Sequence, residues 1–466
     1  MFLTKKNEDA SSKASCRKCL PVYDTGANWR YLNASFSVRN LINFLAILTI
    51  FLDSYSLFGI FPYFNLRGSY LILPIILILC FLLLRNLYFN KFFILILFLL
   101  VILSIYPIII GDNSTLSMSK QVIGIFLNSF IFYLVLKVNN YDVTKLFLSY
   151  LNIAFFVGLL GLAQEIINIL DIFPIRPVQL EGLPLYRVTS IFNEPAHFAE
   201  VMIPAFFVSL VSFTDNTSLL SKRKSLVIIM SLFLSFSGVG YIGVFLSLLL
   251  LIINYRKIRY VLGVGAILIL FSFTAYQNIN EIRERVDGTL NLMTGKSDLL
   301  ESTYSTFALI SNLQVGYHSF LSNPFFGSGI GSHKESYSKY IDKVYNVSIE
   351  DMESHNYLPL NVEDANSLFT RLLSETGLFG LFVFIIFLYN RHILKTNEKN
   401  NYFWIINNAI LIFFLVKLVR GGHYFANGTF LFFWTYYFSK IQSHETSLHF
   451  TLNGSQKYRQ VEKVLV

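Results

Sequence analysis

The sequence predicts an all-α, polytopic integral membrane protein with about twelve transmembrane helices. Of its 466 residues, 54% are hydrophobic and 14% are charged, whereas a typical soluble domain has about 25% charged residues. The mean hydropathy is +0.55. The apolar residues gather in runs of roughly 16–24, the length that an α-helix needs to cross a ~30 Å hydrocarbon core. The alternating pattern of a membrane β-barrel is absent, so helices remain as the way to satisfy the backbone in lipid.

Charged residues, prolines and turn residues set the limits of the apolar runs. In chain order, the spans are expected at 39–60, 70–84, 92–110, 121–138, 146–170, 195–213, 225–237, 241–254, 260–276, 367–389, 402–419 and 424–438. The seventh and eighth spans are short and separated by the tight turn 238–240, so a re-entrant hairpin is an alternative for this pair.

One long polar stretch interrupts the apolar chain. The expected parts are a polar tail (1–38), nine spans (39–275), the polar stretch (276–366), three spans (367–438) and a second polar tail (439–466). We expect the stretch 276–366 to form one large loop that closes over a site built at the ends of the spans.

The distribution of lysine and arginine predicts the orientation of the spans. The formal net charge is +9, and basic residues gather in alternate loops, for example at 222–224 and at Arg391 and Lys395. Such loops stay on the cytoplasmic side. Both tails are therefore expected in the cytoplasm and the 276–366 loop outside, and this rule explains the net charge without a nucleic-acid partner.

The cysteines and the N-terminal residues argue against a metal site, a disulfide and a cleavable signal peptide. Cys80 lies in an apolar run, where we expect it to pack, whereas Cys16 and Cys19 form a single C-x-x-C in a polar tail. No second pair completes a metal site, so we expect neither a metal nor a disulfide. The first 38 residues lack the apolar core of a cleavable signal peptide, and the first span is expected to act as an uncleaved anchor.

Candidate site residues occur directly before the sixth span. Asn193 is a favoured N-cap residue, and Pro195 suits the first turn of a helix. Glu194, His197 and Glu200 follow at intervals that place them on roughly one face of that helix. Such groups are costly at a bilayer unless they face water or a cavity. We interpret them as general-base and acceptor-binding groups, with helix capping and interfacial polarity as the structural alternative.

Three arginines are candidates for phosphate binding, because the guanidinium fork matches phosphate oxygens. Arg187 precedes the sixth span, and Arg283 and Arg285 follow the ninth. A surface arginine is the alternative for Arg187. Acidic residues are interleaved with Arg283 and Arg285, so a solvated helical face is the alternative for that pair.

A second group of candidates follows the long polar stretch. Arg371 and Glu375 are spaced to share one face of a helix that enters the membrane. In lipid they need each other or a polar cavity, and a purely structural ion pair is the alternative. Arg420 and His423 are also expected on the external side, where they would line the same cavity.

Three stretches in this order resemble the O-antigen and capsular polysaccharide polymerase family, whose members are related to the O-antigen ligases. They are the Arg-x5-Asn-Glu-Pro-x-His-Phe-Ala segment (187–199), the Asn-Pro-Phe-Phe-Gly-Ser-Gly-Ile-Gly turn (323–331) and the Asn-Ser-Leu-Phe-x-Arg-Leu-Leu-x-Glu-x-Gly-Leu-Phe-Gly run (366–380). The order of these motifs around one large loop is more specific than any one of them. The resemblance covers residues 160–390 and the layout of the spans.

The resemblance implies a GT-C-like membrane glycosyltransferase of the bacterial inner membrane that needs no metal or cofactor. An acceptor sugar hydroxyl would attack the anomeric carbon of an undecaprenyl-diphosphate-linked oligosaccharide, and polyprenyl diphosphate would leave. Membrane lipid and a chain-length-determining membrane protein are further expected partners. Catalysis is assigned to Glu194, His197 and Arg187. Substrate binding is assigned to Arg283, Arg285, His355, Asn366, Arg371, Glu375 and Arg420.

One departure from the family pattern favours a polymerase over a ligase. Related ligases carry a His-Asn pair upstream of the Glu that precedes Gly, and counting back from Glu375 places Asn366 where that histidine would be. His355 could substitute in space. The alternatives are an O-antigen ligase, a flippase for lipid-linked oligosaccharides and a non-catalytic partner of a polysaccharide machine. A flippase should show internal repeats and polar sites at the midplane, which the sequence lacks.

Overall fold

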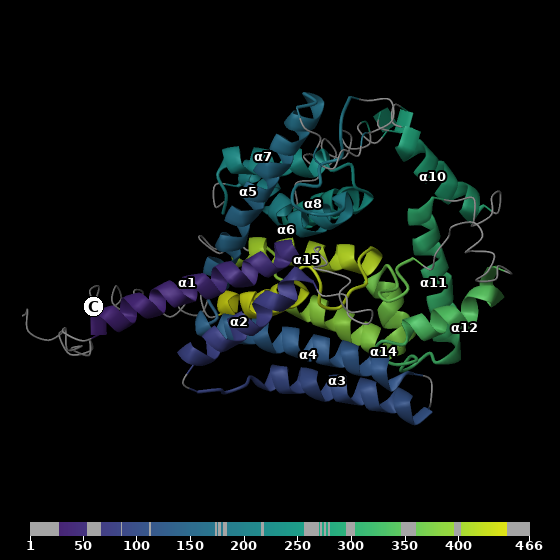
Figure 1. The fold of residues 1–466 in the computed structure, drawn as a ribbon, viewed down its shortest axis with the longest axis horizontal. Helices are drawn as coiled ribbons and strands as arrows, with labels where there is room; N and C mark the ends of the chain where they lie inside the picture. The colour runs from purple at the N-terminus through teal and green to yellow at the C-terminus, as the bar shows by residue number, and fades with distance from the viewer. Residues whose placement is uncertain are drawn as a thin grey trace, which may run out of the picture. The chain divides into compact units, whose positions relative to one another are not determined.

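The computed structural model describes residues 28–53, 67–84, 86–110, 113–172, 175, 179, 184–215, 219–255, 270, 273–274, 276–277, 280–294, 303–345, 360–395 and 402–444. Within these residues the chain forms helices and turns and no strand, which confirms the all-α fold. The helices (Figure 1) are α1 (Asn28–Leu52), α2 (Gly68–Leu83), α3 (Lys91–Ile110), α4 (Thr115–Val138), α5 (Val143–Ile169), α6 (Pro195–Thr214), α7 (Lys222–Phe233), α8 (Gly238–Tyr255), α10 (Asn280–Met293), α11 (Tyr304–Ser322), α12 (His333–Tyr345), α14 (Leu368–Arg391), α15 (Phe403–Val419) and a last helix over 429–444.

Among the described residues, five helices are long and apolar enough to cross a membrane, namely α4, α5, α6, α8 and α14. Each predicted span except the ninth corresponds to a helix, and most of the ninth (260–276) lies outside the described residues. The 12 residues of α7 reach only about 18 Å, which is too short to cross the hydrocarbon core. A re-entrant hairpin of α7 and α8 therefore remains an alternative to two spans. The multi-span character is confirmed, whereas the count of twelve remains a prediction.

The chain divides into two compact units, Met1–Leu41 and Ile42–Val466. Helix α1 begins in the first unit and ends in the second. All the packing and the candidate site described below belong to the second unit.

Helix α6 lies at the centre of one helical group and packs against α5, α7, α8 and α15. Small residues allow these close approaches, as is common in membrane helices. On α8, Gly240 faces Ala199 and Gly243 faces Ile203 of α6, while Gly158 of α5 faces Ser231 of α7. The side chains of α6 are therefore almost entirely buried among other helices.

A second group consists of α2, α3, α4 and the last helix. Helix α4 packs against α2 and α3. The indole Nε1–H of Trp434 donates to the Ser129 carbonyl oxygen of α4 at 2.9 Å, and the ring of Phe93 on α3 lies 5.8 Å from that indole. Cys80 is a free thiol buried in this group, in agreement with its expected packing role.

The polar stretch 276–366 contains α10, α11 and α12 rather than an irregular loop. Helix α11 packs against both α12 and α14, and Phe307, Val315, Tyr337 and Ile341 form a small apolar core between α11 and α12. The hydroxyl of Thr303 caps the first turn of α11. The stretch is therefore anchored directly on α14, the helix that carries Arg371 and Glu375.

Candidate active site

Helix α14 is broken near its middle, and a turn from the polar stretch fills the break. Gly377 has φ 59° and ψ −157°, a conformation that costs a residue with a side chain far more than glycine. The freed carbonyl oxygens of Ser374 and Glu375 accept from the N–H groups of Ser328 and Gly329 at 2.9 and 2.8 Å. Two bonds run the other way, from Leu378 N to Pro324 O at 2.9 Å and from Phe379 N to Phe325 O at 3.0 Å. The Asn-Pro-Phe-Phe-Gly-Ser-Gly turn thus acts as a clasp that fixes the position of Glu375.

The Arg371–Glu375 pair on the first half of α14 is completely buried. Arg371 Nε lies 3.0 Å from Glu375 Oε1, and both side chains are 0% exposed. Arg371 Nη1 donates to the Gly422 carbonyl oxygen at 3.2 Å, and the Tyr424 hydroxyl donates to Glu375 Oε2 at 2.8 Å. The guanidinium lies 4.1 Å from the Tyr424 ring centroid. Arg371 Nη2 is buried and, among the described residues, has no hydrogen-bond partner.

His423 lies beside this pair in a cationic environment. Burial lowers the pKa of the imidazole well below its usual value, and the nearby charges of Arg67, Arg371, Lys417 and His197 lower it further. The ring packs edge-on against Phe425, with 4.6 Å between centroids, and its Nδ1 has no hydrogen-bond partner among the described residues. A bound anion here would raise the pKa of the imidazole and reduce the repulsion among the cationic groups.

A second buried ion pair joins α15 to α6. Lys417 Nζ of α15 is 3.2 Å from Glu200 Oε1 of α6. Asn427 Nδ2 donates to the other Glu200 oxygen at 2.9 Å, and the Asn427 N–H donates to Asp53, which also accepts from Ser69 Oγ at 2.6 Å. Glu200 is thus fully engaged, and its role here is to hold α6, α15 and the 420–427 segment together.

The predicted trio at the start of α6 is separated by the structure. The N-cap residue is Glu194, one position later than the expected Asn193, and its side chain makes no capping bond. Glu194 is exposed, His197 is half-buried near His423, and Glu200 is buried. The three side chains therefore run from solvent into the core instead of sharing one face, because positions i and i+6 are well separated around a helix.

Arg187 is held near the C-terminal end of α5. Glu165 Oε1 accepts from the Tyr186 N–H at 2.9 Å, which fixes the backbone directly before Arg187. Arg187 Nη2 donates to the Phe236 carbonyl oxygen at 3.3 Å, so the guanidinium lies at the start of α8.

Asn366 and Arg420 both hold the segment that carries His423. The Gly421 N–H donates to the Asn366 carbonyl oxygen at 2.9 Å, and the Asn366 N–H donates to Asp364 Oδ1 at 3.0 Å. Arg420 donates to the carbonyl oxygen and to Oγ of Ser305, at 3.3 and 2.8 Å. These contacts join the ends of α11, α14 and α15 around the candidate site.

The other predicted ligands lie elsewhere or are not described. Arg283 of α10 donates to the Tyr276 carbonyl oxygen at 3.3 Å and to that of Gln277, so its guanidinium is directed at the backbone before its own helix. Arg285 also lies in α10, but its side chain is outside the described residues, as is all of His355. The structure thus brings together His197, Asn366, Arg371, Glu375 and Arg420 through the 420–427 segment.

Sequence reasoning missed Lys417, Tyr424 and Asn427. Lys417 lies inside the predicted span 402–419, where an isolated charge is costly and implies a partner. Glu200, a carboxylate inside the predicted sixth span, was the sequence signal for that partner. Among the described residues, no group of three His, Cys, Asp or Glu side chains is placed to hold a metal ion.

The buried imidazole of His333 predicts how the stability of the fold depends on pH. Its ring nitrogens lie 2.9 Å from Ser374 Oγ and 3.0 Å from Asn312 Oδ1. Burial, aided by the charge of Arg371, lowers its pKa to about 3. The neutral form is therefore favoured on folding, and its stabilisation is complete above pH 6.5 and lost as the pH falls toward 3. We expect the unfolding temperature in detergent to fall between pH 7 and pH 4, and to fall less in His333→Gln. Equal pH dependence in both proteins would contradict this.

Residues 225–385 match the model of the O-antigen ligase family. The matched stretch contains the clasp, the break at Gly377 and the Arg371–Glu375 pair. No match was found among curated proteins. Residues 225–385 of the chain are thus similar to the O-antigen ligase family, and the matched residues include the buried ion pair of the candidate site.

Proposed function

We propose that the chain is an O-antigen or capsule polymerase that joins undecaprenyl-diphosphate-linked oligosaccharide repeat units at the external face of the bacterial inner membrane. The observation that supports this proposal is the buried Arg371–Glu375 pair, which lies beside His423 and in which Arg371 Nη2 has no hydrogen-bond partner among the described residues. The family match supports a membrane enzyme of the glycosyltransferase or ligase type. A chain-length-determining membrane protein is a proposed partner.

The proposed reaction is a displacement at the anomeric carbon of the donor. The acceptor hydroxyl oxygen forms the new bond to that carbon, the carbon–oxygen bond to the diphosphate breaks, and its electron pair leaves with polyprenyl diphosphate. The hydroxyl proton passes to a base, for which exposed Glu194 is the proposed group and His197 the nearest substitute. Arg371 and the cationic groups around His423 would stabilise the charge on the leaving diphosphate. Arg187 is proposed to orient the donor.

A polymerase is favoured over a ligase by Asn366. Its carboxamide, which accepts a hydrogen bond from Asn361 Nδ2 at 3.1 Å, cannot serve as the base that a histidine would supply. The ligase is the second candidate, because the matched family is described as O-antigen ligase. In that reaction the acceptor would be lipid A-core in place of a second repeat unit.

The glycolipid profile of a strain that lacks the protein tests the function. Single repeat units on the lipid core would support a polymerase. Polymer that remains on its carrier would support a ligase, and repeat units trapped inside the cell would support a flippase. Either of the last two results would overturn the proposal.

Arg187→Ala and Glu194→Ala are each expected to lower long-chain polysaccharide by about 100-fold or more, the first through lost orientation of the donor and the second through loss of a positioned proton-transfer group. Single-repeat material should persist. Gel profiles of surface glycolipid measure both. Lys334→Ala is the matched control, because this exposed side chain only pairs with exposed Glu363. Normal chain lengths in both site variants at normal expression would refute these assignments.

The proposed orientation predicts which positions react from outside the cell. In a chain whose native cysteines are replaced, Lys334→Cys in α12 should react with an impermeant maleimide on intact spheroplasts. Lys222→Cys at the start of α7 should react only after lysis, since its basic loop is expected in the cytoplasm. The reverse pattern would refute the orientation.

A further inference from the structure

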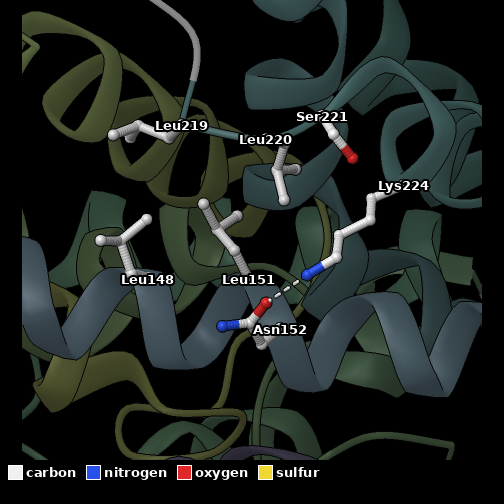
Figure 2. Close-up of a pocket in the computed structure, with 7 residues that line it drawn as sticks. All are labelled: Leu148, Leu151, Asn152, Leu219, Leu220, Ser221 and Lys224. Carbon is white, nitrogen blue, oxygen red and sulfur yellow. Dashed lines mark hydrogen bonds between the residues drawn. The ribbon is translucent and has the colours of Figure 1, made fainter.

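A cavity of about 120 Å³ lies between α5 and the start of α7, and none of its lining residues belongs to the candidate active site. A single water needs only about 10–15 Å³ measured in this way, so the cavity has room for a larger group. Its walls are mostly leucine, with one lysine, one asparagine and one serine (Figure 2). The residues used below are Leu148, Leu151, Asn152, Leu219, Leu220 and Lys224.

Lys224 supplies a positive charge that no carboxylate neutralises. Its Nζ donates to Asn152 Oδ1 at 2.8 Å (Figure 2) and lies 5.5 Å from the Phe155 ring centroid. Among the described residues, no acidic side chain lies within ion-pair distance of this ammonium. Lys222 and Arg223 are exposed next to it, which adds to the local positive charge.

The Lys224–Asn152 contact is exposed and lies beside the apolar surface of α5. Asn152 is about 14 Å along α5 from Val143, at 1.5 Å per residue, and α5 is long and apolar enough to cross a membrane. Phe156 of α5 and Leu226 of α7 are 60% and 53% exposed, as expected of side chains that face lipid. An anionic lipid that lies along this apolar surface could therefore bring its phosphate to the Lys224 ammonium.

We propose that this cavity binds the headgroup of an anionic phospholipid, with the phosphate on Lys224 and the glycerol and upper acyl chain on the leucines. Charge complementarity selects an anion. The four leucines select the lipid over a free phosphate, because a soluble anion gains nothing from apolar walls. Exposed Phe156 and Leu226 continue the apolar surface along which the acyl chains would lie.

Native mass spectrometry of the purified full-length protein tests this site. Phosphatidylglycerol is added to protein in neutral detergent, with phosphatidylcholine as the zwitterionic comparison. We expect Lys224→Met to weaken phosphatidylglycerol binding by about fivefold or more, the effect of one lysine near an anionic lipid. Leu219→Trp, which keeps the lysine but fills the cavity, should weaken binding as well.

Lys222→Met is the matched control, because it removes a neighbouring charge on the same helix outside the cavity lining. Lys222→Met should weaken phosphatidylglycerol binding much less than Lys224→Met does. All variants should keep the wild-type elution volume and unfolding temperature in neutral detergent. Equal losses in the two lysine variants would overturn the proposal, since binding would then follow net charge. Equal binding of the two lipids would also overturn it, as would full displacement of phosphatidylglycerol by an equal concentration of inorganic phosphate.

Discussion

Arg371→Ala is expected to abolish polymer formation and to lower the free energy of unfolding by about 3–5 kcal/mol, the usual cost of leaving one member of a buried ion pair alone. Glu375 would lose its cation while both of its oxygens stay inaccessible to water. The bond to the Gly422 carbonyl and the contact with the Tyr424 ring would be lost at the same time. Polysaccharide profiles and thermal unfolding of the purified protein measure the two effects.

A double variant separates stability from function. Replacing Arg371 by methionine and Glu375 by leucine removes both charges, and such swaps are often neutral or stabilising for folding. We therefore expect this protein to fold but to make no long chains, because it has no guanidinium N–H to offer an anion. Lys334→Ala, which breaks the exposed Lys334–Glu363 pair, should change little. Long chains from the double variant would show that the pair is only structural.

The Arg371–Glu375 pair shows how far local spacing predicts a site. Two opposite charges four residues apart on an apolar helix must pair or face a cavity, and the structure has them paired. Their remaining contacts, with Gly422 and Tyr424, come from a distant segment. No local pattern specifies which segment will pack there, so these partners could not be predicted.

The break in α14 could not be predicted from the sequence for a different reason. Gly377 lies between Ser374-Glu375-Thr376 and an apolar run that starts at Leu378, and a single glycine there is compatible with an uninterrupted helix. The Asn-Pro-Phe-Phe-Gly-Ser-Gly motif was recognisable as a turn from its proline and glycines. That the turn supplies the hydrogen bonds missing from α14 depends on two segments that meet only in the folded protein.

Similar reasoning applies to the long polar stretch. Its low hydropathy separates it from the predicted spans, but α11 is buried along one face against α12 and α14. The side chains on that face are a mixture of small, polar and aromatic residues, among them Ser311, Asn312 and Ser319. An apolar periodicity was therefore absent, although these side chains are satisfied by hydrogen bonds within the fold.

Gly422→Ala is expected to be as damaging as loss of Arg371. A Cβ at this position would lie 1.6 Å from the Asp364 carbonyl oxygen, a backbone atom that cannot move without shifting the start of α14. The displacement would break the Gly421–Asn366 bond and draw the Gly422 carbonyl away from Arg371. We expect a loss of at least about 3 kcal/mol of stability, at the upper end for overpacking, together with loss of long-chain product.

Gly288→Ala is the matched control for this substitution. Gly288 lies in α10, and no atom lies within 4 Å of a Cβ built there. Alanine at an open helical position should be neutral or stabilise by up to about 1 kcal/mol. Thermal unfolding and polysaccharide profiles of both variants make the comparison. If Gly422→Ala behaved like Gly288→Ala, the 420–424 segment would not be packed against the start of α14, and the candidate site would lose the support that places His423 beside Arg371.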